Sequence, residues 1–281
     1  MKNGFVILNY NDYETTIKLV NNIKNFRIID EIVIVDNNSK DASFEHFKLL
    51  MSDKITVLKN NYNNGYSAGN NIGCKYLIDK YEKCNIFISN PDIIIKNEET
   101  LQKLLDSFKL DVGVVSPLIL ENNKYNRGWR LPTPFIDILM NIPILHNKIR
   151  EKNLLYDDSH YDKDIVDVEV VSGCFFLIRS DVLKKIKFFD ENVFLYYEEN
   201  ILGKKLKDLN IRTVVNTKVE VIHNHSISID KNVKKLNKIK ILKKSQMYFE
   251  KYYNGANILE RILLFITSKL ALIIYFICGY R

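Results

Sequence analysis

A carboxylate at the end of an apolar run is the first feature of this sequence that could do chemistry. The run 86–88 is Ile-Phe-Ile, and the polar segment 89–92 that follows it ends in Asp92. Because Pro91 has no N–H for a sheet ladder, the run ends there, and its composition predicts a strand buried on both faces. Beyond the carboxyl end of a parallel strand, Asp92 could hold a divalent cation on a phosphorylated ligand. An ordinary turn is the alternative, because Asn-Pro-Asp is favourable turn chemistry.

Two earlier apolar runs, 4–8 and 31–35, also end in polar clusters. The three clusters are Asn9-Tyr10-Asn11, Asp36-Asn37-Asn38 and Asn90-Pro91-Asp92. Clusters rich in Asn and Asp on one edge of a sheet predict a pocket rather than three unrelated turns. A dinucleotide-binding dehydrogenase is not expected, because its G-x-G-x-x-G turn is missing after the first run.

The elements that must position these clusters alternate between strands and helices. Strands are expected at 4–8, 31–35, 55–58 and 86–88, and helices at 13–26, after Asp41 or Ser43, and after the loop 60–65. This alternation predicts an α/β domain with a largely parallel sheet.

The chain has 281 residues, of which 46% are hydrophobic and 27% are charged. This balance is typical of a folded globular protein. The 4 cysteines form no CxxC pair, so we expect reduced thiols in a cytosolic protein, and we expect no signal peptide before the first strand. The net charge is +7, and residues 231–244 hold seven lysines and no acid. This basic tract lacks arginine and has few aromatic residues, so an anionic membrane or a solvated face is expected ahead of nucleic acid.

Several ordered segments resemble the family 2 glycosyltransferases, and among them the bacterial rhamnosyltransferase-like branch. The segments are 34–39, 64–73 and 89–92, followed by 171–179, 188–191 and 196–199. The resemblance spans roughly residues 4–228. It implies a Rossmann-like domain of the nucleotide-sugar transferase (GT-A) type over 1–228, with a mostly parallel central sheet. Residues 229–281 would form a C-terminal helical extension, first basic and then apolar.

The resemblance implies that a nucleotide sugar lies across the first half of the sheet. Asn9 and Tyr10 would line the base pocket, and Asp36 would hydrogen-bond the base or ribose. The other donor-site candidates are Asn37, Gly65, Ser67, Asn70, Asn90 and Gly173. Residues 170–178 are expected to form a strand beneath the sugar site, with Gly173 leaving space for the donor. Small residues let the backbone approach a ligand, although glycines in this stretch could equally serve a loop and tight helix packing.

A metal site is also implied, since Asn90-Pro91-Asp92 stands where the family has Asp-x-Asp. Asp92 would bind Mg²⁺ or Mn²⁺ bridging the diphosphate, and Asn90 in place of an acid predicts weaker metal binding. His223 follows a predicted strand and would reach the metal or the diphosphate. A polar cap at the strand end is the alternative for His223.

Glu199 matches the position of the family's general base, with Glu198 beside it. An inverting displacement needs one such carboxylate opposite the leaving group. Ile201 stands where many relatives have a further Asp, so the choice between Glu198 and Glu199 as the base stays open. The alternative is that both acids have no catalytic role and are present because the helix dipole favours acids at a helix N-terminus. Trp129 and Arg130 suit acceptor binding by stacking and charge, or else anchor the core.

The apolar run 262–277 contains Lys269, which argues against a membrane-spanning helix. A basic helix followed by an apolar one fits peripheral attachment to the inner face of the cell membrane. Packing against the catalytic domain or in a homodimer interface is the alternative.

These features together predict an inverting, metal-dependent hexosyltransferase, with rhamnose as one candidate sugar. The donor would be a dTDP- or UDP-sugar, and the acceptor a saccharide or lipid-linked saccharide in surface polysaccharide or O-antigen synthesis. Two other functions remain open: a nucleotidyltransferase, or a catalytically inactive homologue that acts as a binding subunit.

Overall fold

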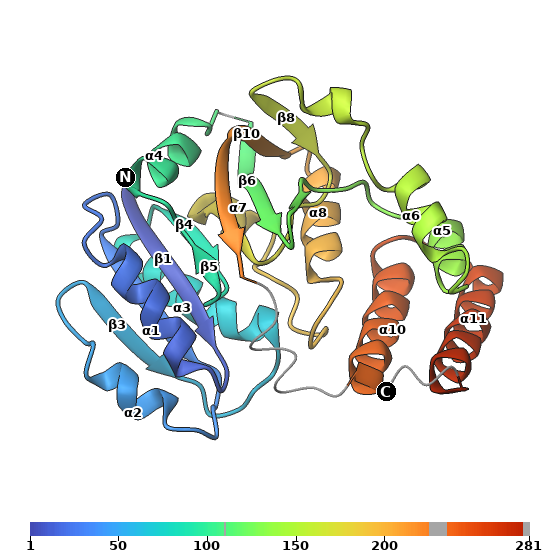
Figure 1. The fold of residues 1–281 in the computed structure, drawn as a ribbon, viewed down its shortest axis with the longest axis horizontal. Helices are drawn as coiled ribbons and strands as arrows, with labels where there is room; N and C mark the ends of the chain where they lie inside the picture. Colours follow the sequence, from blue (N-terminus) through green and yellow to red (C-terminus); the bar gives the residue numbers. More distant parts are fainter. Residues whose placement is uncertain (110, 225–234, 278–281) are drawn as a thin grey trace.

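The first half of the chain alternates between strands and helices, as the apolar runs predict (Figure 1). The elements are β1 (Lys2–Asn9), α1 (Tyr13–Ile23), β2 (Glu31–Asp36), α2 (Ser43–Lys48), β3 (Ile55–Lys59), α3 (Tyr66–Tyr81) and β4 (Cys84–Ser89). All four predicted strands are present. Helix α1 ends short of residue 26, because the chain turns there and Phe26 N–H donates to the Ile23 carbonyl (2.9 Å).

The second half of the chain is less regular. It contains β5 (Ile93–Ile94), α4 (Glu98–Asp106), β6 (Val112–Glu121), β7 (Lys124–Asn126), α5 (Pro134–Met140), α6 (His146–Asn153), the 3-10 turn η1 (Asp158–Tyr161), β8 (Ile165–Val168), β9 (Phe175–Arg179), α7 (Ser180–Lys185), α8 (Glu198–Asp208), β10 (Arg212–His223), α10 (Lys235–Tyr252) and α11 (Ile258–Ile277). The structure is a computed structural model that describes residues 1–109, 111–224 and 235–277. Cys278 and residues 231–234 of the predicted basic tract lie outside these ranges.

One mixed sheet of ten strands forms the centre of the molecule, in the order β3-β2-β1-β4-β9-β6-β10-β5, with β7 beside β6 and β8 beside β10. Strands β3, β2, β1 and β4 are parallel to their neighbours, and so are β6 and β10, whereas β9 is antiparallel to both β4 and β6. The carboxyl ends of β1, β2, β4, β6 and β10 therefore meet at one edge, where β9 begins.

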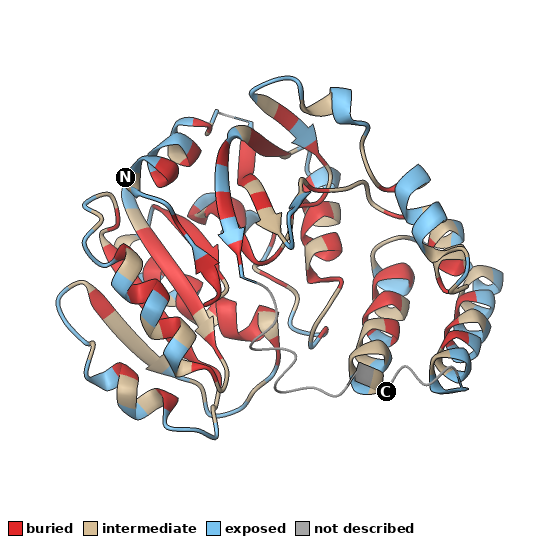
Figure 2. Ribbon diagram, in the orientation of Figure 1, coloured by how far each residue is buried: buried red, intermediate tan, exposed pale blue. Residues whose placement is uncertain are grey.

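Helices cover both faces of the sheet, and the strands between them are buried (Figures 1 and 2). One face packs against α1, α2 and α4, and the other against α3, α7 and α8. Strands β2 and β4 are buried at every residue, as expected for parallel strands covered on both sides. This packing fixes the strand ends that carry the polar clusters.

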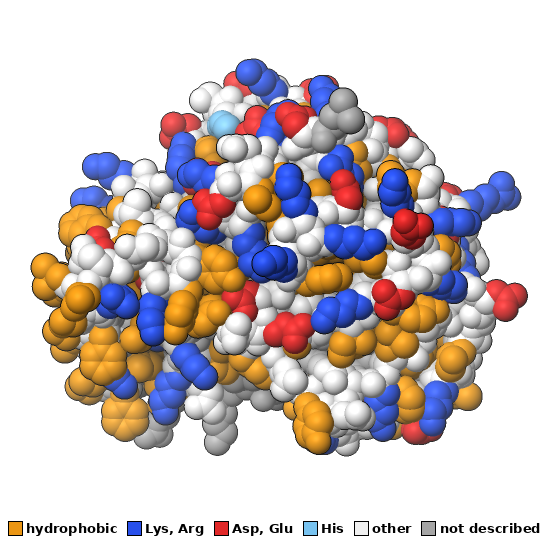
Figure 3. Space-filling model, turned by 180° about the vertical axis from the view of Figure 1, so that it is seen from behind, with side chains coloured by type: hydrophobic (Ala, Val, Ile, Leu, Met, Phe, Trp, Pro, Cys, Tyr) orange, Lys and Arg blue, Asp and Glu red, His pale blue; other side chains and the backbone are white. Residues whose placement is uncertain are grey.

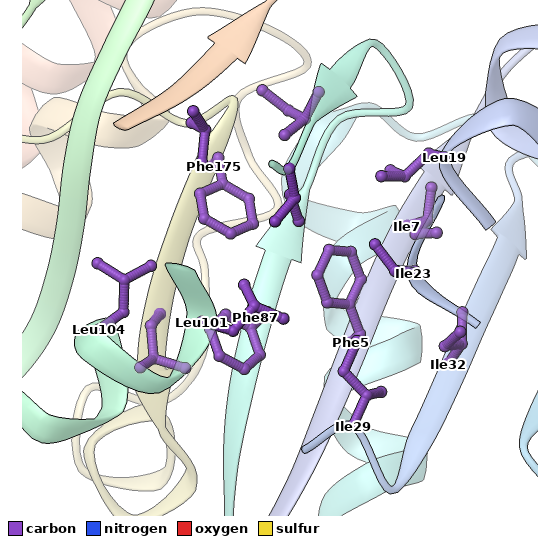
Figure 4. Packing of buried hydrophobic residues seen from close by; sticks show 14 of the residues in the cluster. Phe5, Ile7, Leu19, Ile23, Ile29, Ile32, Phe87, Leu101, Leu104 and Phe175 are labelled. Atoms are coloured by element: carbon purple, nitrogen blue, oxygen red, sulfur yellow. The ribbon is translucent and has the colours of Figure 1, made fainter. Parts of the chain in front are cut away.

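A row of phenylalanine rings joins the two halves of the sheet (Figure 4). Phe5 of β1 lies 5.7 Å from Phe87 of β4, and Phe87 lies 6.2 Å from Phe175 of β9 (ring centroids). All three side chains are fully buried. Truncating such a ring to alanine typically costs about 3–5 kcal/mol, so this row supports the contact between β4 and β9.

One strand begins later than predicted. The strand expected over 170–178 starts only at Phe175, because Val170 pairs with Trp129 and the chain turns at Gly173 and Cys174. The cysteine prediction is confirmed for three residues, since Cys74, Cys84 and Cys174 are buried free thiols.

The C-terminal helices pack beside α5 rather than on the sheet (Figure 1). Helix α11 contacts α10 and α5, and α5 contacts α6. The buried residues of α11 are Leu264, Ser268 and Ala271. Asn141, just after α5, donates to Thr267 (3.1 Å) and Ser268 (3.0 Å). Lys243 of α10 donates to the Asn141 side-chain oxygen, so a polar network joins the three helices.

The outer side of α11 is apolar and exposed. Its exposed large apolar residues are Ile258, Leu259, Ile262, Leu263, Phe265, Ile266, Leu270, Ile273, Ile274, Phe276 and Ile277. Apolar side chains gather on this side of the molecule in the view from behind (Figure 3). Among the helices in the described ranges, none has both the length and the apolar character needed to cross a membrane.

Candidate functional site

The ends of β1 and β2 place a carboxylate at the sheet edge. Asn9 and Asp36 are register partners, and Asn9 Nδ2 donates to Asp36 Oδ1 (3.3 Å). The other oxygen, Asp36 Oδ2, is buried and accepts no hydrogen bond from any described residue. A buried carboxylate oxygen without a donor is costly unless a ligand supplies one. Asp36 is therefore oriented to bind a ligand hydroxyl or N–H, and Tyr10, half-buried, follows on the same edge.

The N-terminus of α3 continues this edge. Asn37, after β2, donates to the Asn63 side chain (2.9 Å) and to the Gly65 carbonyl (3.3 Å), which holds the loop ahead of α3. Ser67 Oγ and Asn70 Oδ1 in the first turns of α3 are buried without a hydrogen-bond partner among the described residues. The Ser67 hydroxyl beside a helix N-terminus suits an anionic ligand such as a diphosphate, whereas Asn70 Oδ1 can only accept a hydrogen bond, for example from a ligand hydroxyl.

Residue 65 must be glycine both because its backbone has a positive φ and because no side chain would fit there. Its φ is +97°, and a Cβ there would lie 2.1 Å from the Phe194 carbonyl oxygen. The adjacent Tyr66 N–H donates to the same oxygen (3.0 Å). Gly65 therefore brings the start of α3 against the segment that leads into α8.

Asp92 and His223 meet at the next part of the edge. Asp92 Oδ1 lies 3.2 Å from His223 Nε2, and Glu121 Oε2 at the end of β6 lies 3.6 Å from His223 Nδ1. Burial lowers the pKa of His223, but Asp92 and Cys174 outweigh it and raise the pKa to about 11. The raised pKa favours the protonated form of His223, which pairs with the Asp92 carboxylate. Asn90 contributes its backbone N–H, which donates to the Cys174 carbonyl (2.8 Å) and so joins β4 to the start of β9.

These side chains fit a divalent cation only in part. Asp92 Oδ1 is buried and accepts no well-aligned hydrogen bond from the described residues. The same part of the chain contains no group of three His, Cys, Asp or Glu residues arranged to enclose a metal. Mg²⁺ and Mn²⁺ in nucleotide sites often take one or two carboxylates from the protein and the other ligands from phosphates and water. Asp92, with Glu121 and His223 near it, matches that open type of site.

Two carboxyl groups begin α8 on the other side of Gly173. Gly173 N–H donates to Glu199 Oε1 (3.3 Å), and Tyr66 O–H of α3 donates to the Gly173 carbonyl. Glu198 is 9% exposed, and its Oε2 has no hydrogen-bond partner within the described ranges. Burial, followed by the charge of Glu199, raises the pKa of Glu198 well above its ordinary value. Burial also raises the pKa of Glu199, opposed by backbone N–H groups including that of Gly173.

Such a pair can hold and accept a proton at a higher pH than two exposed carboxyl groups. Because Glu198 is the more strongly shifted, it holds its proton while Glu199 ionises. Glu199, ionised beside a glycine and near the nucleotide side of the sheet, has the chemistry of a general base.

Trp129 and Arg130 are both anchored in the structure. Trp129 Nε1 donates to Asn200 Oδ1 on α8 (3.0 Å). The Arg130 guanidinium stacks on Tyr156 (4.1 Å to the ring centroid) and donates to the Leu155 carbonyl. Trp129 is half-buried, and its indole N–H is satisfied by Asn200. The part that each residue plays toward an acceptor remains a prediction.

A groove of about 460 Å³ lies beside Trp129, and one of its lining residues, Glu121, is the neighbour of His223. Its lining includes Glu121, Tyr125, Arg127, Trp129, Tyr156 and Tyr161. Aromatic rings with interspersed charged groups are suited to saccharides. Glu121, Tyr125 and Tyr156 were not predicted, because only the fold brings the β6–β7 hairpin and the segment after α6 together around one groove.

The predicted site residues therefore fall into connected groups. Asn9, Asp36, Asn37, Gly65, Ser67 and Asn70 lie along the first half of the edge. Asn90, Asp92, Gly173, Glu198, Glu199 and His223 lie around the β4–β9 contact. Trp129 and Arg130 line or flank the groove. Tyr66 and Phe194, which connect these parts, were not predicted.

Comparison with known proteins places the chain in a family. Residues 5–187 match the family described as Glycosyl transferase family 2. The chain belongs to glycosyl transferase family 2. This confirms the family resemblance, while the rhamnosyltransferase-like branch remains a prediction.

A curated relative of this family 2 protein is the low-salt glycan biosynthesis hexosyltransferase Agl10 of Haloferax volcanii. The two are 27% identical over 226 residues, which cover 80% of this chain and 67% of the relative.

Solved glycosyltransferase structures share the fold. The mannosyltransferase PcManGT of Pyrobaculum calidifontis, solved with GDP-Man and Mn²⁺, has a TM-score of 0.59 at 13% identity, covering 99% of this chain and 76% of that chain. TarS of S. aureus (residues 1–349), solved with UDP-GlcNAc, has a TM-score of 0.57 at 14% identity, and the match covers 97% of this chain and 82% of the TarS chain. The family 2 chain therefore has a GT-A-like α/β fold, as predicted.

Proposed function

We propose that this family 2 protein transfers a hexose from a nucleoside diphosphate sugar to a saccharide or lipid-linked saccharide, with inversion. The observation that carries the proposal is the position of Glu199. Its carboxylate accepts from Gly173 N–H, while Tyr66, at the start of α3, donates to the Gly173 carbonyl. One glycine thus separates the candidate base from the helix that would hold the donor. The hexosyltransferase named among the relatives supports a hexose.

The donor would bind along the first half of the sheet edge. Asp36 Oδ2 would accept from the ribose or base, and Asn9 and Tyr10 would flank the base. Ser67, with the α3 N-terminus, would bind the diphosphate, and Asn70 Oδ1 would accept a hydrogen bond from a ribose hydroxyl. Asp36 Oδ2, Ser67 Oγ and Asn70 Oδ1 are buried and have no hydrogen-bond partner among the residues that the structure describes.

Asp92 would hold a divalent cation, Mg²⁺ or Mn²⁺, on the diphosphate, with His223 and Glu121 beside it. Bound there, the cation would offset the charge that builds on the leaving nucleoside diphosphate. PcManGT is solved with Mn²⁺, which supports a metal of this class.

In the chemical step, Glu199 accepts the proton of an acceptor hydroxyl. The acceptor oxygen forms a bond to the anomeric carbon as the bond from that carbon to the diphosphate oxygen breaks. Attack from the face opposite the leaving group inverts the configuration. A raised pKa makes Glu199 a stronger base than an exposed carboxylate, and such a base contributes typically about 10²–10⁴-fold.

The acceptor would enter through the groove beside Trp129. The groove is continuous with Glu121, which lies next to His223, and Trp129 is bonded to Asn200, the residue after Glu199. Tyr125, Tyr156 and Tyr161 supply rings on which sugars can stack. A role in surface polysaccharide or O-antigen synthesis is consistent with such an acceptor.

Release of nucleoside diphosphate tests the proposal. UDP-, dTDP- and GDP-linked hexoses, including dTDP-rhamnose, would be incubated with the protein, Mn²⁺ and a panel of saccharide acceptors. We expect diphosphate release to depend on an acceptor and to be lost in Glu199→Gln, which should still bind the nucleotide. In a parallel assay that supplies a nucleoside triphosphate and a hexose 1-phosphate, release of pyrophosphate would identify a nucleotidyltransferase. Nucleotide binding without turnover in either assay would identify an inactive homologue.

We further propose that the outer side of α11 lies on an anionic membrane surface. Its exposed apolar residues are accompanied by Lys269 on the same helix and by Lys240 and Lys244 on α10, all exposed. Apolar and basic groups together bind anionic bilayers at the interface.

Co-sedimentation with vesicles of phosphatidylglycerol and phosphatidylcholine tests this. The double variant Ile266→Glu/Ile273→Glu should lose binding, whereas Leu49→Glu, at an apolar position that is 84% exposed on the other side of the molecule, should keep it. A wild-type protein that stays in the supernatant and elutes as a dimer would instead assign the α11 surface to a homodimer interface.

A further inference from the structure

The turn ahead of α8 has a conformation that is unfavourable for its residues. Tyr196 and Tyr197 both have positive φ, 68° and 66°, and neither is glycine. Tyr197 caps α8 without any side-chain hydrogen bond to the helix, and Glu198 and Glu199 follow at once. Large residues keep such a conformation only where the surrounding structure enforces it. The direction of the first turn of α8 therefore depends on what holds Tyr197.

The Tyr197 side chain is held by α5. Its hydroxyl lies 2.8 Å from both Oδ1 and Oδ2 of Asp137, so the phenol donates to a carboxylate that is fully buried. The Tyr197 ring also packs on Phe249 of α10, with ring centroids 5.5 Å apart. The phenol and the ring are thus fixed by two different helices.

Helix α10 completes the contact through Glu250. Glu250 is fully buried, and burial, followed by the charge of Asp137, raises its pKa to about 10. It is therefore protonated at neutral pH and hydrogen-bonds Asp137, while Asn254 Nδ2 donates to both of its oxygens (3.0 Å each). The protonated Glu250 and the Tyr197 phenol together stabilise the negative charge of Asp137.

Two further contacts from α10 reach the same region. Ser245 Oγ donates to the Leu195 carbonyl (2.8 Å), two residues before Tyr197, and Gln246 Nε2 donates to the Asp137 carbonyl (3.4 Å). Apolar side chains of similar volume would commonly be more stable than a buried set of polar and acidic groups. Such a set of directional hydrogen bonds instead fixes one orientation of the turn that contains Tyr197.

We propose that Tyr197, Asp137 and Glu250 form a positioning cluster, through which α5 and α10 fix the turn before α8 and direct Glu198 and Glu199 toward the acceptor. None of the three touches the reacting atoms, so they are positioning residues. The proposal rests on the proposed function, in which Glu199 is the base of the transfer step. It assigns to α10 a part in catalysis, although the family match ends at residue 187.

The mildest test is Tyr197→Phe, which removes one oxygen and keeps the ring on Phe249. A hydrogen bond to a charged group carries enough energy for an effect of about ten- to a hundredfold. We expect kcat to fall about tenfold or more, with the dissociation constant of the nucleoside diphosphate unchanged. Tyr81→Phe is the matched control, because it removes a tyrosine–carboxylate hydrogen bond of similar length (2.7 Å, to Glu31) at the other end of the sheet. Equal kcat values for the two variants would overturn the proposal.

Substitutions of Glu250 test the proton in the cluster. Glu250→Gln keeps a donor for Asp137, so its kcat should stay within about threefold of wild type. Glu250→Leu removes the donor and should resemble Tyr197→Phe. If both variants kept wild-type kcat, Glu250 would have no positioning role. Should the leucine variant fail to fold, Tyr197→Phe still decides.

Hydrogen exchange separates this proposal from the proposed function. The backbone amides at the start of α8, 198–201, should exchange faster in Tyr197→Phe than in wild type or Tyr81→Phe. This readout does not need turnover, so it applies even if the wild type transfers no sugar and the proposed function fails. Unchanged exchange in Tyr197→Phe would overturn the positioning cluster whatever the activity.

Discussion

Glu198→Gln separates the roles of the two carboxyl groups at the start of α8. Glu198 is 9% exposed, and burial followed by the Glu199 charge raises its pKa well above the ordinary 4.5. The folded protein therefore keeps Glu198 neutral, and ionisation of this group opposes folding. Glutamine has the same shape and no charge. We expect the variant to keep its turnover and to be more stable than the wild type at neutral pH.

The size of the effect follows from proton linkage. Below pH 4.5 the folded and unfolded wild type both hold the proton, so the two proteins should be about equally stable. As the pH rises, the unfolded chain ionises first, and the wild type loses about 1.4 kcal/mol per unit until the folded-state pKa is passed. Each kcal/mol corresponds to about 2–4 °C in Tm for a protein of comparable size. The advantage of the variant should therefore grow with pH and then level off.

Two measurements check this prediction. Calorimetry over a range of pH gives the difference in Tm, and the pH profile of kcat/KM gives the acid limb of Glu199. That limb should lie above pH 4.5 and should be nearly the same in Glu198→Gln, because glutamine imitates the protonated acid. Glu199→Gln should lose about 10²–10⁴-fold in kcat. If Glu198→Gln lost transfer and Glu199→Gln kept it, our assignment of the two roles would be refuted.

Three further predictions concern other parts of the chain. Asp92→Asn should weaken Mn²⁺ binding in calorimetric titration and lower transfer, and transfer that survives EDTA would contradict a metal role. Gly65→Ala should cost about 1–3 kcal/mol in urea unfolding, because its φ is +97° and the new Cβ would lie 2.1 Å from the Phe194 oxygen; an unchanged midpoint would contradict this. Lys80→Met should cost about 1–3 kcal/mol at neutral pH, since buried Glu31 loses its cation. Burial acts to raise the Glu31 pKa, but Lys80 and neighbouring hydroxyls give a net lowering, so this cost should shrink as the pH falls below 4.5.

Much of the fold could be predicted because apolar runs and turn residues are local signals. The four strands β1–β4 appear where the runs 4–8, 31–35, 55–58 and 86–88 place them. The antiparallel insertion of β9 between β4 and β6 could not be predicted, since no local pattern specifies which strands pair across the sheet. The later start of β9 has the same origin, because Val170 leaves the expected strand to pair with Trp129.

The candidate site shows the same division. Asn9, Asp36 and Asp92 follow apolar runs, so their place at one edge could be predicted from strand ends alone. The ion pair of Asp92 with His223 depends on β10 pairing with β5. The hydrogen bonds that link Tyr197, Asp137 and Glu250 join the start of α8 to α5 and α10. A single sequence gives no signal for such contacts, because the residues are polar and lie on helices whose packing partners it does not specify.

The position of β9 has a consequence for synthesis of the chain. Every residue of β4 is buried, with β1 on one side and β9 on the other. At about 5–20 residues per second, Phe175 is made roughly 4–17 s after Ser89. During that interval β4 is an apolar edge strand of the growing N-terminal half, a surface prone to pair with other chains. The donor-site residues of β1, β2 and α3 lie on one side of the β4–β9 contact, and Glu198 and Glu199 lie on the other. The complete site therefore forms only after β9 has paired with β4.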